Sequence, residues 1–216
     1  MRRIFPLIVL LAIMALQAYA ASNEHHDDTD LLSSEAPAPS MPFVYPFDSD
    51  LFPEQRQKLV AELCHGVARQ PGHQDASLAE PMINGAWLMI RSDRAAHAID
   101  LFLMSILQSQ ELPDAYLGMA AAGLALGYGD DLIGTCSARA ESFGSPASAD
   151  SYVEYGGELY RHGRLEDAIE LFKRALELDP EHMNAVIGIH IVYTELGQAD
   201  EARTYEEMLD RLLEDR

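Results

Sequence analysis

Residues 152–180 read YVEYGGELYRHGRLEDAIELFKRALELDP, and this stretch decides the fold of the chain. Apolar and small residues recur in it at spacings of three and four, both before and after Gly163, which is the pattern of two amphipathic helices. Gly163 separates the two halves and Pro180 closes the second half, and both residue types commonly end helices. The stretch therefore predicts two helices joined by a short turn.

The hairpin pattern recurs at a fixed distance along the chain. The segment Ala168-Ile-Glu-Leu-Phe172 matches Ala98-Ile-Asp-Leu-Phe102, which lies 70 residues earlier, or two periods of 34 plus two inserted residues. The spacing of 34 also separates Gly129, Gly163 and Gly197, and Pro146 and Pro180. Self-similarity at such a period is typical of stacked helical hairpins.

The sequence shows no alternating strand pattern, so the predicted fold class is all-α. Predicted helices cover about 53–69, 114–127, 130–142, 150–162, 165–178, 182–196 and 199–213, and two more open near Ser77 and Asp93. The last helix has an acidic side that suits the end of an array. We expect its apolar residues to pack inward, namely Met208, Leu209, Leu212 and Leu213.

One unit, residues 149–182, carries a full set of repeat positions. Its signature residues are Tyr152, Tyr155, Gly156, Leu159, Gly163, Ala168, Phe172, Ala175 and Pro180. With these residues the chain resembles the tetratricopeptide-repeat family, as an exported, bacterial-type member. The resemblance implies a right-handed helix-hairpin solenoid of about four such repeats with an extra N-terminal helix. The repeats would span 79–216, as units at about 79–112, 115–148, 149–182 and 183–216.

The first twenty residues have the pattern of a signal peptide. Arg2 and Arg3 precede an apolar run from Ile4 to Leu16, and small residues flank Tyr19 at the end of the leader. We expect cleavage after Ala20 and export to the periplasm or the medium. The apolar run is shorter than the roughly 20 residues that span a bilayer. No stable membrane insertion is therefore expected after cleavage, and an uncleaved N-terminal anchor is the alternative.

Residues 21–52 differ in composition from both flanking regions. They are acidic and rich in proline, which predicts a flexible segment. Within it, residues 41–52 form a strap of prolines and aromatic residues that either packs on its own domain or acts as a recognition motif. The motif His25-His26-Asp27-Asp28 offers weak ligands for a transition metal, and a solvated tail is the alternative. Residues 53–78 are predicted to form the N-terminal helix and a linker.

Charge and motif content exclude several function classes. The chain has 15 Lys and Arg against 35 Asp and Glu, a net charge of −20, which would repel nucleic acid. It has no phosphate-binding loop, no nucleophile elbow and no His-Glu-x-x-His motif. We therefore predict no catalytic residues, no metal centre and no cofactor, and expect that the protein is not an enzyme.

Two cysteines remain to be explained. Cys64 and Cys136 would meet an oxidising compartment after export, where one disulfide could close a long loop. Each lies among apolar residues of a predicted helix, so two buried free thiols are the alternative.

The family resemblance implies a concave surface lined by the first helix of each hairpin. The candidate peptide-binding residues on it are Trp87, Arg91, Tyr116, Met119, Val153, Tyr160, Arg161, Asn184, Ile187 and Ile191. Apolar side chains with two arginines suit an apolar peptide segment that carries an acidic group or a C-terminal carboxylate. The alternative is that several of these residues belong to the core or are covered by the 41–52 strap.

The predicted function is that of an exported protein–protein interaction module or scaffold, which binds a peptide or protein segment in a concave helical groove. The alternative is a regulatory or adaptor subunit of a cell-envelope enzyme or assembly complex, docking through its acidic surface. Metal handling by the His/Asp tail ranks third. Pairing of solenoid ends into a homo-oligomer stays open.

Overall fold

The computed structural model describes residues 53–66, 76–109 and 111–214. These residues contain nine α-helices, one short 3-10 helix (Ala76–Leu78) and no strand, which confirms the all-α prediction. The helices are α2 (Pro53–Cys64), α3 (Ala79–Arg91), α4 (Ala95–Gln108), α5 (Pro113–Ala125), α6 (Asp130–Glu141), α7 (Ala149–Arg161), α8 (Leu165–Leu178), α9 (Met183–Glu195) and α10 (Ala199–Glu214).

The predicted leader (1–20) and the segment 21–52, with its strap and its His/Asp motif, lie outside the described residues. In the part of the chain that is described, none of the helices combines the length and the apolar character needed to cross a bilayer.

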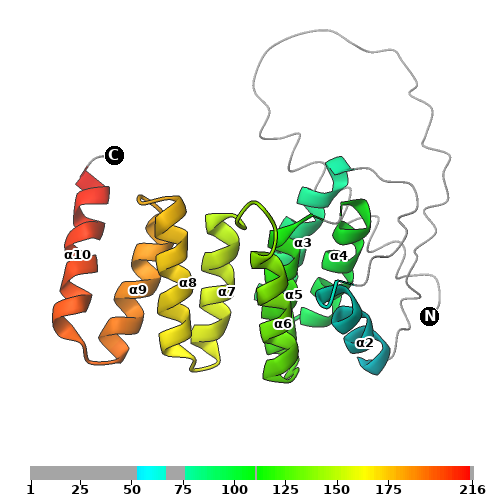
Figure 1. The fold of residues 1–216 in the computed structure, drawn as a ribbon. Coiled ribbons are helices and arrows are strands. Elements are labelled where there is room, and N and C mark those ends of the chain that lie inside the picture. Colours follow the sequence, from blue (N-terminus) through cyan, green and yellow to red (C-terminus); the bar gives the residue numbers. More distant parts are fainter. Residues whose placement is uncertain (1–52, 67–75, 110, 215–216) are drawn as a thin grey trace, which may run out of the picture. The chain divides into compact units, whose positions relative to one another are not determined.

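Consecutive helices pair into four hairpins: hairpin 1 (α3 and α4), hairpin 2 (α5 and α6), hairpin 3 (α7 and α8) and hairpin 4 (α9 and α10). Each hairpin packs on the next one, through α4 on α5, α5 on α7 and α8 on α9. Figure 1 shows the later helices standing side by side in chain order. Such a stack buries the apolar side of each hairpin against its neighbours, so the described chain is a helical solenoid.

Each hairpin turn contains one residue with a positive φ. These residues are Asp93, Gly127, Gly163 and Gly197, with φ of 56°, 71°, 73° and 71°. The amide that follows each of them donates to a carbonyl five residues back, as Arg164 N does to Leu159 O at 2.9 Å. This is the Schellman arrangement, which ends a helix and reverses the chain.

The turn residues correct the predicted register of hairpin 2. Their successive separations are 34, 36 and 34 residues, so Gly127 and not Gly129 is the equivalent of Gly163. Gly129 instead caps the start of α6 with a φ of −63°. Hairpin 2 accordingly begins at Pro113, two residues before the predicted unit. The two inserted residues therefore lie between Gly127 and the start of α7.

Large aromatic rings fill spaces left by glycines on facing helices. Phe172 of α8 lies against Gly156 of α7 and Gly188 of α9, where an added Cβ would come within 2.8 and 2.7 Å of the ring. Phe102 of α4 lies in the same way against Gly118 of α5, with 2.1 Å to an added Cβ. Both rings are buried. Small residues at these positions therefore let the helices approach closely.

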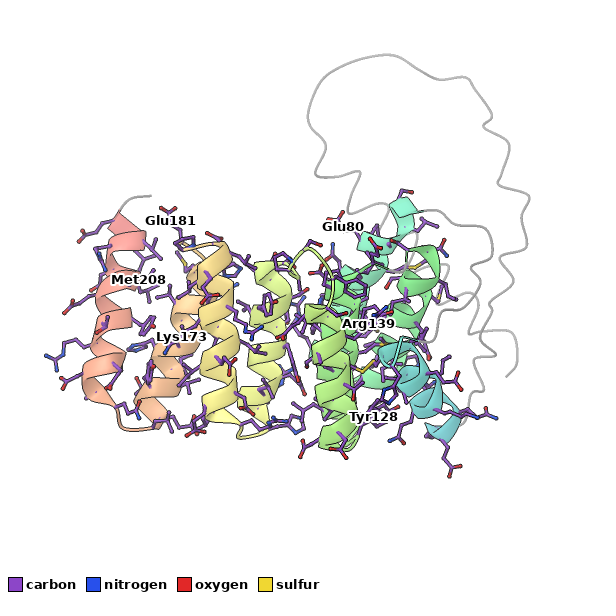
Figure 2. The ribbon with its side chains drawn as sticks, viewed as in Figure 1. Glu80, Tyr128, Arg139, Lys173, Glu181 and Met208 are labelled. Carbon is purple, nitrogen blue, oxygen red and sulfur yellow. A yellow bond between two sulfur atoms is a disulfide. The ribbon has the colours of Figure 1, made fainter. Side chains whose placement is uncertain are left out.

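The extra helix α2 is joined to two hairpins. A disulfide links Cys64 at its end to Cys136 of α6, so of the two alternatives for the cysteines the structure has the bridge. Figure 2 shows this bond in yellow. Near its start, Arg56 donates from Nε and Nη2 to the carboxylate of Asp100 on α4, at 2.8 and 3.1 Å. Helix α2 therefore spans hairpins 1 and 2.

The end of the array differs from the prediction. On α10 only Ala202 is buried, whereas Met208, Leu209 and Leu212 are half-buried and Leu213 is 55% exposed. The reason is that α10 packs chiefly against α9 and has neighbours on one side only. Figure 2 labels Met208 on this terminal helix.

Candidate functional site

The first helices of the hairpins form one row, in which α3 contacts α5, α5 contacts α7 and α7 contacts α9. All ten candidate peptide-binding residues lie on these helices. The structure divides them into a closed section on α3 and α5 and an open section on α7 and α9.

In the closed section three candidates are buried and do not line a surface. Trp87, Tyr116 and Met119 are only 5%, 3% and 1% exposed, so their prediction as peptide-binding residues is not supported. The ring of Trp87 instead meets Phe102 edge-on, with centroids 5.4 Å apart. Its indole Nε1 donates to Ser151 Oγ on α7 at 3.3 Å. These residues belong to the core, which was the alternative interpretation of the sequence.

The composition of α5 explains this burial. Five of its central residues are small, namely Gly118, Ala120, Ala121, Ala122 and Gly123, and all of them are buried. Four helices, α3, α4, α6 and α7, contact α5. Because the side chains of α5 are short, α3 and α7 lie close enough for their own side chains to meet across α5. Two contacts join them, Trp87 with Ser151 and Arg91 with Glu154; we call these the α3–α7 bridge.

The other side of α5 is covered by an aromatic and cationic cluster. Tyr116 lies against Phe143, with ring centroids 5.3 Å apart. The guanidinium of Arg139 lies 4.8 Å from the Phe143 ring and 5.8 Å from the Tyr116 ring. Burial raises the pKa of the Tyr116 hydroxyl. This cluster holds Tyr116 in the core.

The open section is the inner face of α7 and α9. Val153, Tyr160 and Ile187 are half-buried, Asn184 is exposed and Ile191 is 43% exposed. Gly157 adds free space, because a Cβ at this position would meet no atom within 4 Å. We call these six residues the α7–α9 face. Its apolar side chains are available to a partner, unlike those of the closed section.

One contact crosses the α7–α9 face. A hydrogen bond with the Glu195 carboxylate of α9 raises the pKa of the Tyr160 hydroxyl of α7. The Tyr160 hydroxyl and the Glu195 carboxylate therefore lie close together near the C-terminal ends of the two inner helices.

A row of carboxylates runs along α7 beside this face. Asp150, Glu154 and Glu158 are spaced by four residues, so they lie on one side of the helix. Each has a basic side chain beside it: His182 lies 3.0 Å from Asp150, Arg91 pairs with Glu154, and Glu158 pairs with Arg161 and lies 3.1 Å from His162. Glu158 itself is buried.

This row changes the predicted role of the two arginines. Arg91 and Arg161 are about half exposed, yet both already pair with carboxylates of α7. The charges of Arg91 and Arg161 are therefore already compensated within the chain, and an acidic ligand would have to compete with Glu154 and Glu158 for them. Burial raises the pKa of the Glu154 carboxyl, and the neighbouring Arg91 and Arg161 oppose this rise.

The sequence interpretation missed the carboxylates of this site. Glu154, Glu158 and Glu195 are not among the residues predicted for this site. The spacing of four among Asp150, Glu154 and Glu158 was a usable signal. Their pairing with Arg91 and His182 could not be read from the sequence, since these partners come from other hairpins.

A cavity among the described residues lies elsewhere, between α2 and α6. Its volume is about 470 Å³, and it is lined by Glu54, Gln57, Lys58, Ala61, His65, Asp131, Leu132 and Thr135. It is wide open and its charges are mixed, so it does not select one kind of ligand. In the described part of the chain, no three His, Cys, Asp or Glu side chains converge as a metal site requires.

Comparison with known proteins finds a family match near the C-terminal end of the chain. A tetratricopeptide-repeat family model matches residues 159–215. Two solved structures show similarity to the chain: "Crystal structure of MamA" is 20% identical, with 63% of this chain and 77% of that chain covered and a TM-score of 0.44. A second one, "MamA AMB-1 P212121", is 16% identical, with 74% and 98% covered and a TM-score of 0.45. Likenesses this distant carry no functional argument. No curated protein shows significant similarity to the chain.

Proposed function

We propose that the chain, of which residues 159–215 match a tetratricopeptide-repeat family model, is an exported protein-interaction module that binds an apolar segment of a partner on its α7–α9 face. Helical-hairpin solenoids present extended surfaces that bind other proteins. The observation that carries the proposal is the exposure of Ile191 beside Val153, Tyr160 and Ile187, an apolar surface that no described helix covers.

The charges around this face favour a partner with basic residues next to its apolar ones. The carboxylates of Asp150 and Glu195 lie on or beside it, with His182 and the Tyr160 hydroxyl as their neighbours, whereas the two nearby arginines already pair with Glu154 and Glu158. With a net charge of −20 on the chain, approach of a basic segment is also favoured at a distance. This replaces the acidic ligand group expected from the sequence.

Export is part of the proposal, and two features support it. The first twenty residues have the pattern of a cleavable leader. The bond between Cys64 and Cys136 belongs to the class of structural disulfides that persist in oxidising compartments.

Affinity capture with matched variants tests the face. The wild type, Ile191→Asp and Leu213→Asp proteins would each be incubated with cell-envelope extract, and the bound proteins quantified by mass spectrometry. Leu213 is a fair control because it is an exposed leucine on α10, 55% exposed against 43% for Ile191. We expect partners that are lost with Ile191→Asp and kept with Leu213→Asp. The same bound set for all three proteins would exclude the α7–α9 face.

A second candidate function is that of an adaptor subunit that docks through its acidic exterior. The half-buried apolar residues of α10, flanked by Glu206, Glu207 and Asp210, favour it. Binding would then weaken strongly with salt, because exposed charges are screened. It would also respond to Leu213→Asp and not to Ile191→Asp, so the same captures distinguish the two functions.

A further inference from the structure

One position of the repeat carries very different residues along the inner row of first helices. It lies six residues before each positive-φ turn residue, and it is occupied by Trp87 on α3, Ala121 on α5, Gly157 on α7 and Ile191 on α9. Trp87 and Ala121 are buried, whereas Ile191 is 43% exposed and an added Cβ at Gly157 would meet no atom within 4 Å. Gly157 therefore leaves space on α7 at the position where α3 carries an indole.

The buried indole shows what kind of side chain fits this position. Trp87 meets Phe102 of its own hairpin edge-on, with ring centroids 5.4 Å apart. The equivalent of Phe102 in hairpin 3 is Phe172, 70 residues later, which lies against Gly156 and Gly188. Hairpin 3 thus keeps the phenylalanine of this pair and lacks the indole. An aromatic ring that a partner places at the empty position would stand to Phe172 as Trp87 stands to Phe102, an arrangement that aromatic pairs prefer.

The apolar side chains around Gly157 also suit a ring. Val153 lies one turn earlier on α7, and Ile187 and Ile191 lie on the neighbouring helix α9. Val153 and Ile187 are half-buried, so each still offers apolar surface beside the exposed Ile191. Aromatic side chains bury a large area when they enter such a site, and they carry much of the binding energy of protein interfaces.

The charge at a second repeat position reverses on α9. Two residues before the turn residue, α3 and α7 carry Arg91 and Arg161, both paired with carboxylates of α7, whereas α9 carries Glu195. The Glu195 side chain is exposed and lies close to the Tyr160 hydroxyl. Tyr160 follows Gly157 by three residues on the same side of α7, so this carboxylate lies near the next turn after the glycine. A basic side chain of a partner is therefore attracted to this end of the face.

We infer that the α7–α9 face binds a partner helix that places an aromatic side chain over Gly157 and, one turn further on, a basic side chain beside Glu195. Residues four apart lie on one side of a helix, as Trp87 and Arg91 do on α3, from which both reach α7 in the α3–α7 bridge. The inner row thus already contains one helix with an aromatic and basic pair of this kind. The inference names the partner chemistry for the proposed function and rests on that function.

A titration followed by nuclear magnetic resonance, with isotope-labelled glycine in the protein, tests the inference. The probe is a short alanine-based helical peptide with one tryptophan and, four residues later, one arginine; matched peptides carry alanine for the tryptophan or glutamine for the arginine. We expect the probe to move the amide signal of Gly157 and not that of Gly134, an exposed glycine of α6. Loss of the tryptophan should weaken binding about tenfold, and loss of the arginine about two- to fivefold. An unmoved Gly157 signal, or equal binding of the three peptides, would overturn the inference.

Two pairs of variants check the contacts on the protein side. Gly157→Leu fills the space and should abolish binding of the probe, whereas Gly134→Leu should leave it unchanged. An added Cβ meets no atom within 4 Å at either position, so both variants should keep the helical circular dichroism signal. Glu195→Gln should remove the advantage of arginine over glutamine in the peptide, whereas Glu177→Gln, at an exposed carboxylate of α8, should preserve it. Equal binding within either pair would contradict the inference.

Failure of the proposed function is detected separately, by the capture experiment. If Ile191→Asp loses its partners but the probe does not move Gly157, the binding face stands and the aromatic and basic helix is wrong. If all captured sets are the same, the proposed function is removed even when the probe binds.

Discussion

The ring of Phe172 occupies the space that a side chain on Gly188 would need. The two residues lie on consecutive hairpins, and an added Cβ on Gly188 would come within 2.7 Å of the ring. The contact between hairpins 3 and 4 therefore depends on a residue without a side chain facing one with a large side chain. The same relationship, between Phe102 and Gly118, joins hairpins 1 and 2.

The first prediction concerns this contact. Gly188→Ala should lower the free energy of unfolding by about 1–3 kcal/mol, because the buried ring has no room to move. Gly157→Ala on α7 is the control, since its Cβ would meet nothing within 4 Å. That change should raise stability by up to about 1 kcal/mol, the usual gain for Ala over Gly within a helix. Urea denaturation monitored by circular dichroism measures both, and equal effects would contradict the packing.

The second prediction concerns the turns. Asp93 is the non-glycine member of the positive-φ series, with a φ of 56°. Replacing it with glycine should raise the free energy of unfolding by about 0.5 kcal/mol, because an L side chain is strained in this region. The reciprocal Gly163→Ala should lower it by about 1 kcal/mol for the same reason. Thermal denaturation would show opposite shifts, and shifts of one sign would argue against equivalent turns.

The third prediction concerns the disulfide. Cys64→Ala/Cys136→Ala should lower the free energy of unfolding by about 4 kcal/mol, the loop-entropy value for a closed loop of this length. Fully reduced wild-type protein should match the variant in a denaturant titration. A stable reduced protein with an unchanged midpoint would mean that the loop is already restricted in the unfolded state.

The fourth prediction concerns pH. The pKa of Glu154 is raised above the usual 4.5 in the folded protein, chiefly by burial. The folded state therefore binds this proton more tightly than the unfolded state, so the contribution of Glu154 to stability falls as pH rises from about 4.5 through the raised pKa. Glu154→Gln removes this term. The difference in unfolding free energy between Glu154→Gln and wild type should shift in favour of the variant across that range, and a constant difference would contradict the raised pKa.

Much of the fold could be read from local signals in the sequence. The helices predicted at 130–142, 165–178 and 199–213 agree with α6, α8 and α10 to within a residue at each end. Apolar spacing and turn residues involve positions that are close together in the sequence, so the sequence alone reveals them. The register of hairpin 2 was wrong because two glycines lie close together near that turn, and only backbone geometry distinguishes Gly127 from Gly129.

The residues of the candidate site were predicted less accurately than the helices. Val153, Asn184 and Ile191 are half-buried or exposed, so they stay predicted binding residues, but Trp87, Tyr116 and Met119 are buried. A period of 34 assigns the same face to every first helix. The period does not reveal that the small side chains of α5 allow side chains of α3 and α7 to meet across it.

By itself the sequence determined that the chain is helical, that its helices pair, and where most of them begin and end, because those properties depend on neighbours along the chain. The tertiary structure alone decided that Cys64 meets Cys136, that Arg91 meets Glu154, and that only half of the inner row is open. These outcomes depend on the distances between hairpins, which are set by how closely small and large side chains pack across them.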